Sequence, residues 1–175
     1  MTTTEAGQAG AGERADLLET LAKHRRFLRH TIRGLTDEQA AQRTTVSQLC
    51  LGGLIKHVSF VERQWIGFIT EGPAAMGQPE ATGPDDWSAG FRMLAGETLA
   101  GLLDEYEKTA RGTDGLVATL PDLEVSQPLP QAPWYEQGAS WSARRVLLHV
   151  IGETAQHAGH ADIIRESLDG AKSMG

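Results

Sequence analysis

The feature that most constrains this chain is the stretch of residues 141–168, an amphipathic helix by pattern with two ionisable groups on its apolar side. The stretch contains no proline, is rich in helix-forming residues and is followed by Gly170. At about 100° per residue, one stripe of such a helix faces a core. The members of that stripe are Val146, Val150, Glu153, His157, Ala161, Ile164 and Leu168. Because burying an unpaired charge is costly, Glu153 and His157 require a proton, a partner or a metal ion.

Three further segments carry apolar residues at helical spacing. We predict helices over residues 13–35, 47–70 and 91–110. Thr36 and Gln39 fit a capping box and predict an additional short helix. Since no convincing strand accompanies these helices, the expected fold class is all-α, a four-helix bundle with long crossover connections.

The two long connections are rich in proline and glycine. Residues 72–90 contain three prolines, and residues 120–139 contain four. We expect the second connection to be an irregular lid or a pair of short strands, with Ser140 capping the last helix. Glycines 52 and 53, near the start of the second long helix, are expected to let a neighbouring backbone come close.

Length and charge limit the class of protein. A chain of 175 residues favours one domain, with residues 1–11 as a disordered tail, 12–170 as the bundle and 171–175 as a C-terminal tail. The formal net charge of −7 disfavours nucleic acid or an anionic membrane as partner. The N-terminus lacks the features of a signal peptide, and a single cysteine, Cys50, suits a reducing compartment. We therefore expect a cytoplasmic protein.

A histidine also interrupts the apolar stripe of the second long helix. If the two stripes face each other, His57 approaches Glu153 and His157, which lie one helical turn apart. Imidazole nitrogen and carboxylate oxygen suit Zn²⁺ and other divalent transition metals, and three protein ligands leave a fourth position open. Two alternatives remain: a histidine on an apolar stripe is often a hydrogen-bonded core residue, and Glu-x3-His is a common surface pair.

The residues expected to bind substrate surround this cluster. They are Trp65, Trp87, Trp134, Tyr135 and His160. Aromatic residues in long loops often wall a pocket, although these could instead cover the end of the bundle. His160 is a neighbour of the ligands, an alternative ligand, or a polar residue at the pocket mouth.

Two segments carry a resemblance to a known family. LGGLIKHVSFVERQW at residues 51–65 and LLHVIGETAQHAGHADIIRE at residues 147–166 resemble the DinB-like (YfiT-like) superfamily of metal-dependent enzymes. The pattern looks like the branch that contains mycothiol-dependent maleylpyruvate isomerases and mycothiol S-transferases. This resemblance implies a four-helix bundle with three metal ligands, His57, Glu153 and His157, and no catalytic residue beyond the metal site. It also implies a low-molecular-weight thiol as co-substrate: mycothiol, bacillithiol or glutathione.

The activity that follows is that of a metal-dependent thiol S-transferase. The metal expected is Zn²⁺, with Ni, Mn and Fe left open. A thiol at the open position loses its proton, and the resulting thiolate attacks a small electrophile. The resemblance implies mycothiol as this thiol. The alternative is a non-catalytic stress-response protein that sequesters a small molecule or metal in the same pocket. The sequence identifies neither the electrophile nor the oligomeric state, and a homodimer stays open.

Overall fold

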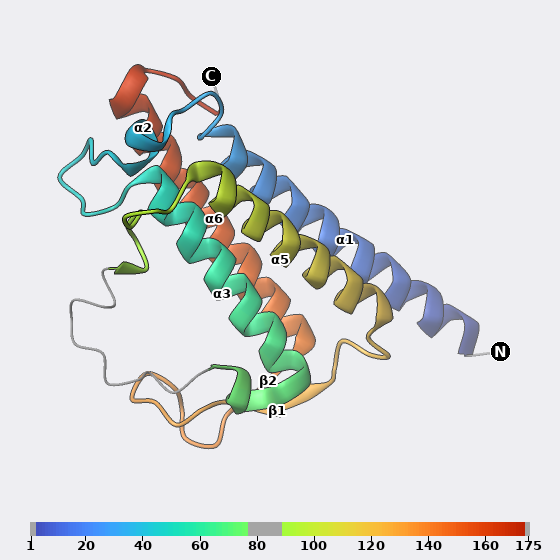
Figure 1. Ribbon diagram of the computed structural model, residues 1–175. Helices are drawn as coiled ribbons and strands as arrows, with labels where there is room; N and C mark the ends of the chain where they lie inside the picture. The colour runs from blue at the N-terminus through green and yellow to red at the C-terminus, as the bar shows by residue number, and fades with distance from the viewer. Residues whose placement is uncertain (1–2, 77–88, 174–175) are drawn as a thin grey trace.

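The computed structural model describes residues 3–76 and 89–173, and it is mostly helical (Figure 1). Four long helices dominate this part of the chain: α1 (Thr3–His30), α3 (Leu51–Glu71), α5 (Leu99–Thr119) and α6 (Ala143–Asp169). The shorter elements are α2 (Asp37–Ala41), the 3-10 helix η1 (Gly72–Met76), and the strands β1 (Ser126–Pro128) and β2 (Ser140–Ser142). The predicted all-α class is confirmed, and none of the described helices is long and apolar enough to cross a membrane.

Local hydrogen bonds explain where two of the helices begin. The hydroxyl of Thr36 accepts from the backbone N–H of Gln39, whose side chain accepts from the N–H of Thr36, so the predicted capping box is present at α2. The prediction that Ser140 caps the last helix was wrong. Ser142 caps α6 by accepting from the N–H of Arg145, while Ser140 pairs in β2.

The third long helix lies further along the chain than the predicted range of 91–110. Thr98 caps α5 by accepting a hydrogen bond from a backbone N–H of its first turn. Residues 91–97 form turns and irregular structure instead, and the side chains of Phe91 and Met93 pack against α3. The helix continues past Ala110 because its later turns carry buried side chains such as Val117.

Two other helices differ from the predicted ranges at their ends. α3 begins at Leu51 rather than near Ser47, because the hydroxyls of Thr45 and Ser47 each accept a hydrogen bond from a backbone N–H two residues on, both at 3.2 Å. Such local bonding competes with helix formation. α1 begins at Thr3, inside the segment for which the sequence predicts a tail, and it ends at His30.

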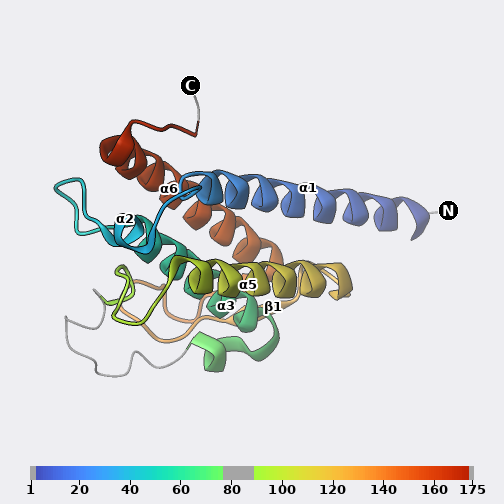
Figure 2. The same cartoon turned by 45° about the horizontal axis from the view of Figure 1, so that its top comes forward.

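The four long helices pack in a closed ring. α6 contacts α1 and α3, and α5 contacts α3 and α1. α3 and α6 run side by side, whereas α1 and α6 cross at an angle (Figure 2). The strands β1 and β2 pair antiparallel, with Ser126 opposite Ser142, so that the connection between α5 and α6 is folded back onto the start of α6.

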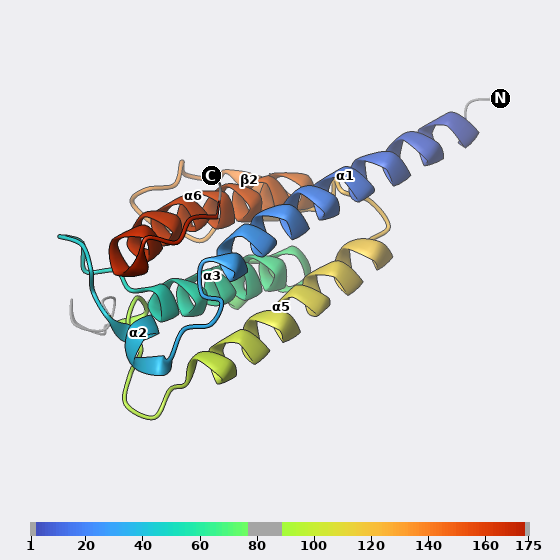
Figure 3. The same cartoon turned by 90° about the horizontal axis from the view of Figure 1, so that it is seen from above.

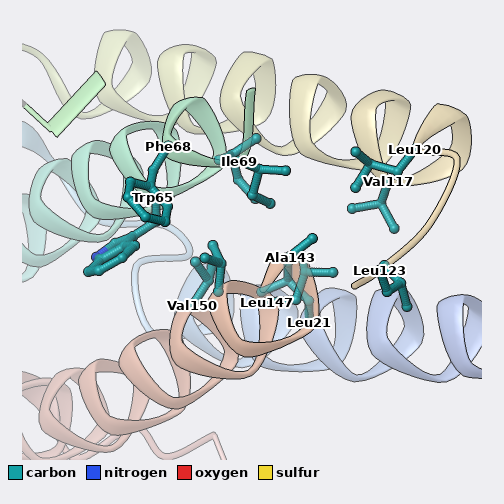
Figure 4. Close-up of a cluster of buried hydrophobic side chains, with 12 residues drawn as sticks. Leu21, Trp65, Phe68, Ile69, Val117, Leu120, Leu123, Ala143, Leu147 and Val150 are labelled. Atoms are coloured by element: carbon teal, nitrogen blue, oxygen red, sulfur yellow. The ribbon is translucent and has the colours of Figure 1, made fainter. Parts of the chain in front are cut away.

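Buried side chains form two apolar clusters with a polar layer between them. The first cluster contains Leu21, Phe68, Val117 and Val150, among others, and is shown in Figure 4. The second contains Leu28, Leu54, Tyr106 and Ala161. Between them, in sequence along the helices, lie the buried polar residues Arg25, Ser59, Glu62, Thr109, Thr113, Thr154 and His157. Polar groups inside a core need internal partners, and the candidate site belongs to this layer.

Candidate metal centre

α3 and α6 bring His57, Glu153 and His157 together. Each side chain offers one ligand atom, and the three atoms lie within 4.8 Å of one another. Glu153 and His157 meet because four residues make about one turn of α6, and their Oε2 and Nε2 atoms are 3.6 Å apart. His57 faces them from α3, with its ring centroid 4.8 Å from that of His157. The convergence expected from the two apolar stripes is therefore present.

These donors fit a divalent metal. Two imidazole nitrogens and one carboxylate oxygen form a ligand set typical of zinc sites that keep one position open. Donor atoms about 2.1 Å from one Zn²⁺ lie roughly 3.4 Å from each other, so side-chain movements on the order of 1 Å would complete the coordination.

Burial favours the neutral form of both imidazoles. It lowers the pKa of His57 to about 4, and the neighbouring His157 contributes to that decrease. Burial also lowers the pKa of His157; the carboxylate of Glu153 opposes this shift, and His160 adds to it. Neutral imidazole is the form that binds a metal ion, so protons compete little for these two nitrogens near neutral pH.

A close backbone approach determines what covers His57. Its ring stacks on Phe91 with centroids 4.0 Å apart and an interplanar angle of 26°. Phe91 can come this near because Gly53 has no side chain: a Cβ there would lie 1.9 Å from the carbonyl oxygen of Phe91. The same holds at Gly52, where a Cβ would lie 2.2 Å from the sulfur of Met93. The close backbone approach predicted for these glycines is confirmed at Gly53, whereas at Gly52 the close neighbour is a side chain.

Two further histidines flank the three central residues. The Nδ1 atom of His160 lies 3.4 Å from the Nδ1 atom of His157. His149 lies on the other side, with its Nε2 atom 3.9 Å from Oε1 of Glu153. His160 is thus a neighbour of the cluster, and its expected role in binding substrate remains a prediction.

The aromatic residues predicted to bind substrate lie in different environments. Trp65 is 5% exposed and stacks on Trp141, with ring centroids 4.7 Å apart. Tyr135 contacts both of these rings edge-on, at 6.5 and 6.1 Å, and Trp134 is 72% exposed. Trp87 lies outside the described residues. Trp65, Tyr135 and Trp141 therefore form one aromatic group. His149 also contacts this group, with its ring centroid 4.7 Å from that of Trp65.

Sequence reasoning missed a buried ion pair in the same polar layer. Glu62 of α3 is fully buried and accepts hydrogen bonds from the guanidinium of Arg25 and, at 2.6 Å, from the hydroxyl of Thr113. A signal existed: Arg25 lies between Leu21 and Leu28 on the apolar stripe of α1, just as His57 interrupts the stripe of α3. The interruption shows that a partner is needed, but it does not identify which residue supplies it.

Comparisons with known proteins add a family and a fold. The family model described as Mycothiol-S-transferase matches residues 16–170. Among solved structures, the chain is similar to a protein described as the conserved protein of locus from Enterococcus faecalis. The TM-score is 0.66 at 15% identity, over 89% of this chain and 96% of that chain, which shows a shared fold alone. No curated protein matches the chain.

Proposed function

The chain belongs to the mycothiol-S-transferase family, a DinB-like family, and from this premise we propose that it is a metal-dependent thiol S-transferase. In the proposed reaction the thiolate of mycothiol forms a thioether bond to the carbon of a small electrophile, and the leaving group of that electrophile, such as a halide, departs with the bonding electrons. The observation that carries the metal dependence is the convergence of the ligand atoms of His57, Glu153 and His157 within 4.8 Å. Of the divalent metals, Zn²⁺ suits this ligand set best.

The three candidate ligands have different roles at the proposed metal ion. His57 and His157 supply neutral nitrogen donors, and Glu153 supplies a carboxylate that lowers the net charge of the site. A divalent cation held there would lower the pKa of a thiol at its open position, so that sulfur reacts as the thiolate. The stacking of Phe91 on His57 restricts the orientation of that imidazole ring and covers it on one face.

The aromatic group beside the site is the proposed wall for substrate. We assign substrate contact to Tyr135, to the exposed Trp134 and to His160, with Trp65 supporting the wall from the core. Trp87 stays in this assignment on sequence grounds alone. Aromatic loop residues positioned by a rigid scaffold are a common way to build such a wall.

A four-helix bundle with long crossover connections is the proposed architecture beneath this site. Its support is the closed ring of contacts among α1, α5, α3 and α6. In that ring α1 and α3 are diagonal, as are α5 and α6, so the connections between them cross from one side of the ring to the other.

Substitution of Glu153 tests the proposal. Glu153→Gln keeps the size and one oxygen ligand but removes the negative charge, so the sulfur becomes less nucleophilic. We expect turnover to fall roughly tenfold or more, with a smaller loss of bound metal. Metal content is measured by elemental mass spectrometry, and thioether formation by mass spectrometry with mycothiol and a panel of haloalkyl electrophiles. The control is Glu105→Gln on α5, where the side chain is 59% exposed.

Two results would contradict the proposal. Wild-type protein that is fully metallated but forms no thioether with mycothiol, bacillithiol or glutathione is not an S-transferase, and the sequestering function would then be favoured. Wild-type protein that acts equally well without metal does not use these three ligands as proposed.

A further inference from the structure

The outer side of α6 exposes apolar side chains that nothing in the described chain covers. α6 packs on α1 and α3 and touches β2, and it lies at the edge of the helix group (Figure 3). On its other side Leu148 is 48% exposed and Ile163 is 63% exposed. The full stripe consists of Arg145, Leu148, Gly152, Ala155, Gln156, Gly159, Ile163 and Glu166. At about 100° per residue these eight positions share an arc roughly 100° wide.

Within the residues that the structure describes, no packed neighbour requires glycine at the glycine positions of this stripe. A Cβ at Gly152 or at Gly159 would meet nothing within 4 Å. Glycine in a helix interior costs about 1 kcal/mol relative to alanine. Gly112 and Gly115 of α5 are equally open, but they share their exposed surface with the charged residues Lys108, Arg111 and Asp114. On α6 no charged residue separates Arg145 from Glu166 along the stripe, and its middle consists of small residues and one uncharged polar side chain, Gln156, so a second helix can approach closely there.

The order of residues along the stripe is symmetric. Leu148 and Ile163 are equidistant from the midpoint between Ala155 and Gln156. The same holds for Gly152 with Gly159, which are both small. It also holds for Arg145 with Glu166, which carry opposite charges. Within the chain, the guanidinium of Arg145 lies over the ring of Trp141, and exposed Glu166 pairs with Lys172 at 2.9 Å. The residue types of this surface are arranged symmetrically about its midpoint, and the charges at its two ends have opposite signs. Such a surface is complementary to a second copy of itself in the antiparallel orientation.

We propose that the outer side of α6 is the interface of a homodimer, in which two α6 helices pack antiparallel about a two-fold axis at this midpoint. In that arrangement Leu148 of one copy lies against Ile163 of the other, and the glycines let the two helices approach closely. Arg145 of each copy faces Glu166 of the other, so that each Glu166 gains an intermolecular partner in addition to its exposed pair with Lys172. The symmetry and the charge complementarity favour a second copy over a different protein.

The size of the interface sets its expected strength. The stripe is about 32 Å long, from 1.5 Å per residue. A single pair of helices buries less than the ~800 Å² per partner of a standard stable interface. The dimer therefore dissociates on dilution, and sedimentation velocity from low-micromolar to near-millimolar concentration should show a monomer–dimer equilibrium.

The first variant places a charge in the apolar part of the proposed interface. Leu148→Glu places a carboxylate against an apolar partner twice per dimer, and we expect the dissociation constant to rise on the order of tenfold or more. Phe60→Glu on α3 is the matched control, because Phe60 is 49% exposed and lies on another helix. The control should dimerise like the wild type. Circular dichroism and thermal melting show that each variant is folded, as expected for exposed positions.

The decisive comparison reverses the charges at the two ends of the stripe, singly and together. Arg145→Glu and Glu166→Arg each place like charges opposite one another and should weaken the dimer, whereas the double variant restores opposite charges and should recover it. A mixture of the two single variants should form heterodimers. A wild-type protein that stays monomeric throughout the concentration range overturns the proposal. So does equal dimerisation of the Leu148 and Phe60 variants, or a double variant no better than the singles.

Discussion

Removing Arg25 should destabilise the protein severely, because this residue is the cationic partner of a carboxylate in the core. Glu62 is fully buried, and Arg25 is only 5% exposed. The Nε atom of Arg25 lies 3.2 Å from Oε2 of Glu62, and its Nη2 atom donates to Oε1. Arg25→Met keeps an apolar side chain of similar length, so the main loss is the charge and its hydrogen bonds.

The size of the effect follows from what remains around Glu62. In the variant its only remaining described hydrogen-bond donor is the hydroxyl of Thr113, 2.6 Å away. Breaking one side of a buried ion pair costs about 3–5 kcal/mol, a large part of the 5–15 kcal/mol that stabilises an ordinary domain. The second partner of Arg25, Asp114, has a side chain 51% exposed, so that pair adds less than about 1 kcal/mol.

Urea unfolding at neutral pH, followed by circular dichroism, measures the loss. The double variant Arg25→Met/Glu62→Leu removes both charges and should recover most of the stability. Arg111→Met is the control, because that side chain is 67% exposed and should cost less than about 0.5 kcal/mol. A loss below about 1 kcal/mol in Arg25→Met, or a double variant as unstable as the single, would refute this reasoning.

Four further predictions concern the candidate site. His57→Ala should remain folded but bind Zn²⁺ at least tenfold more weakly in calorimetry; an unfolded variant would mean that the ion is structural. Gly53→Ala should cost about 1–3 kcal/mol in thermal unfolding, because its Cβ would lie 1.9 Å from the carbonyl oxygen of Phe91; unchanged stability would contradict that close approach. Trp134→Ala should raise KM for the electrophile while stability changes by less than about 0.5 kcal/mol, since this side chain is 72% exposed; the opposite pattern would make it a structural cover. Because the pKa of His57 falls from 6.5 to about 4 in the folded protein, its contribution is full above pH 6.5 and is lost as the pH falls toward 4. Metal-free protein should lose up to about 3 kcal/mol across that window, and a flat profile would show that His57 is not buried as described.

The three candidate ligands were accessible from the sequence because each breaks a local pattern. His57, Glu153 and His157 interrupt apolar stripes, and a stripe is recognised from residues within a few turns of one helix. Arg25 and Glu62 interrupt stripes in the same way, yet they were not recognised as a pair. They lie 37 residues apart in the chain, and no local pattern connects them.

Helical periodicity therefore identified the helical segments, their buried sides and the ionisable groups that needed a partner, since all three depend on residues about one turn apart. The position of residues 91–97 could not be obtained that way. Their apolar spacing is compatible with a helix, and they leave the helix because Gly53 offers the backbone at Phe91 a place to pack on α3. Contacts between helices likewise select Glu62 as the partner of Arg25. The energy of such contacts depends on which surfaces meet in space, a property that neighbouring residues in the chain do not encode.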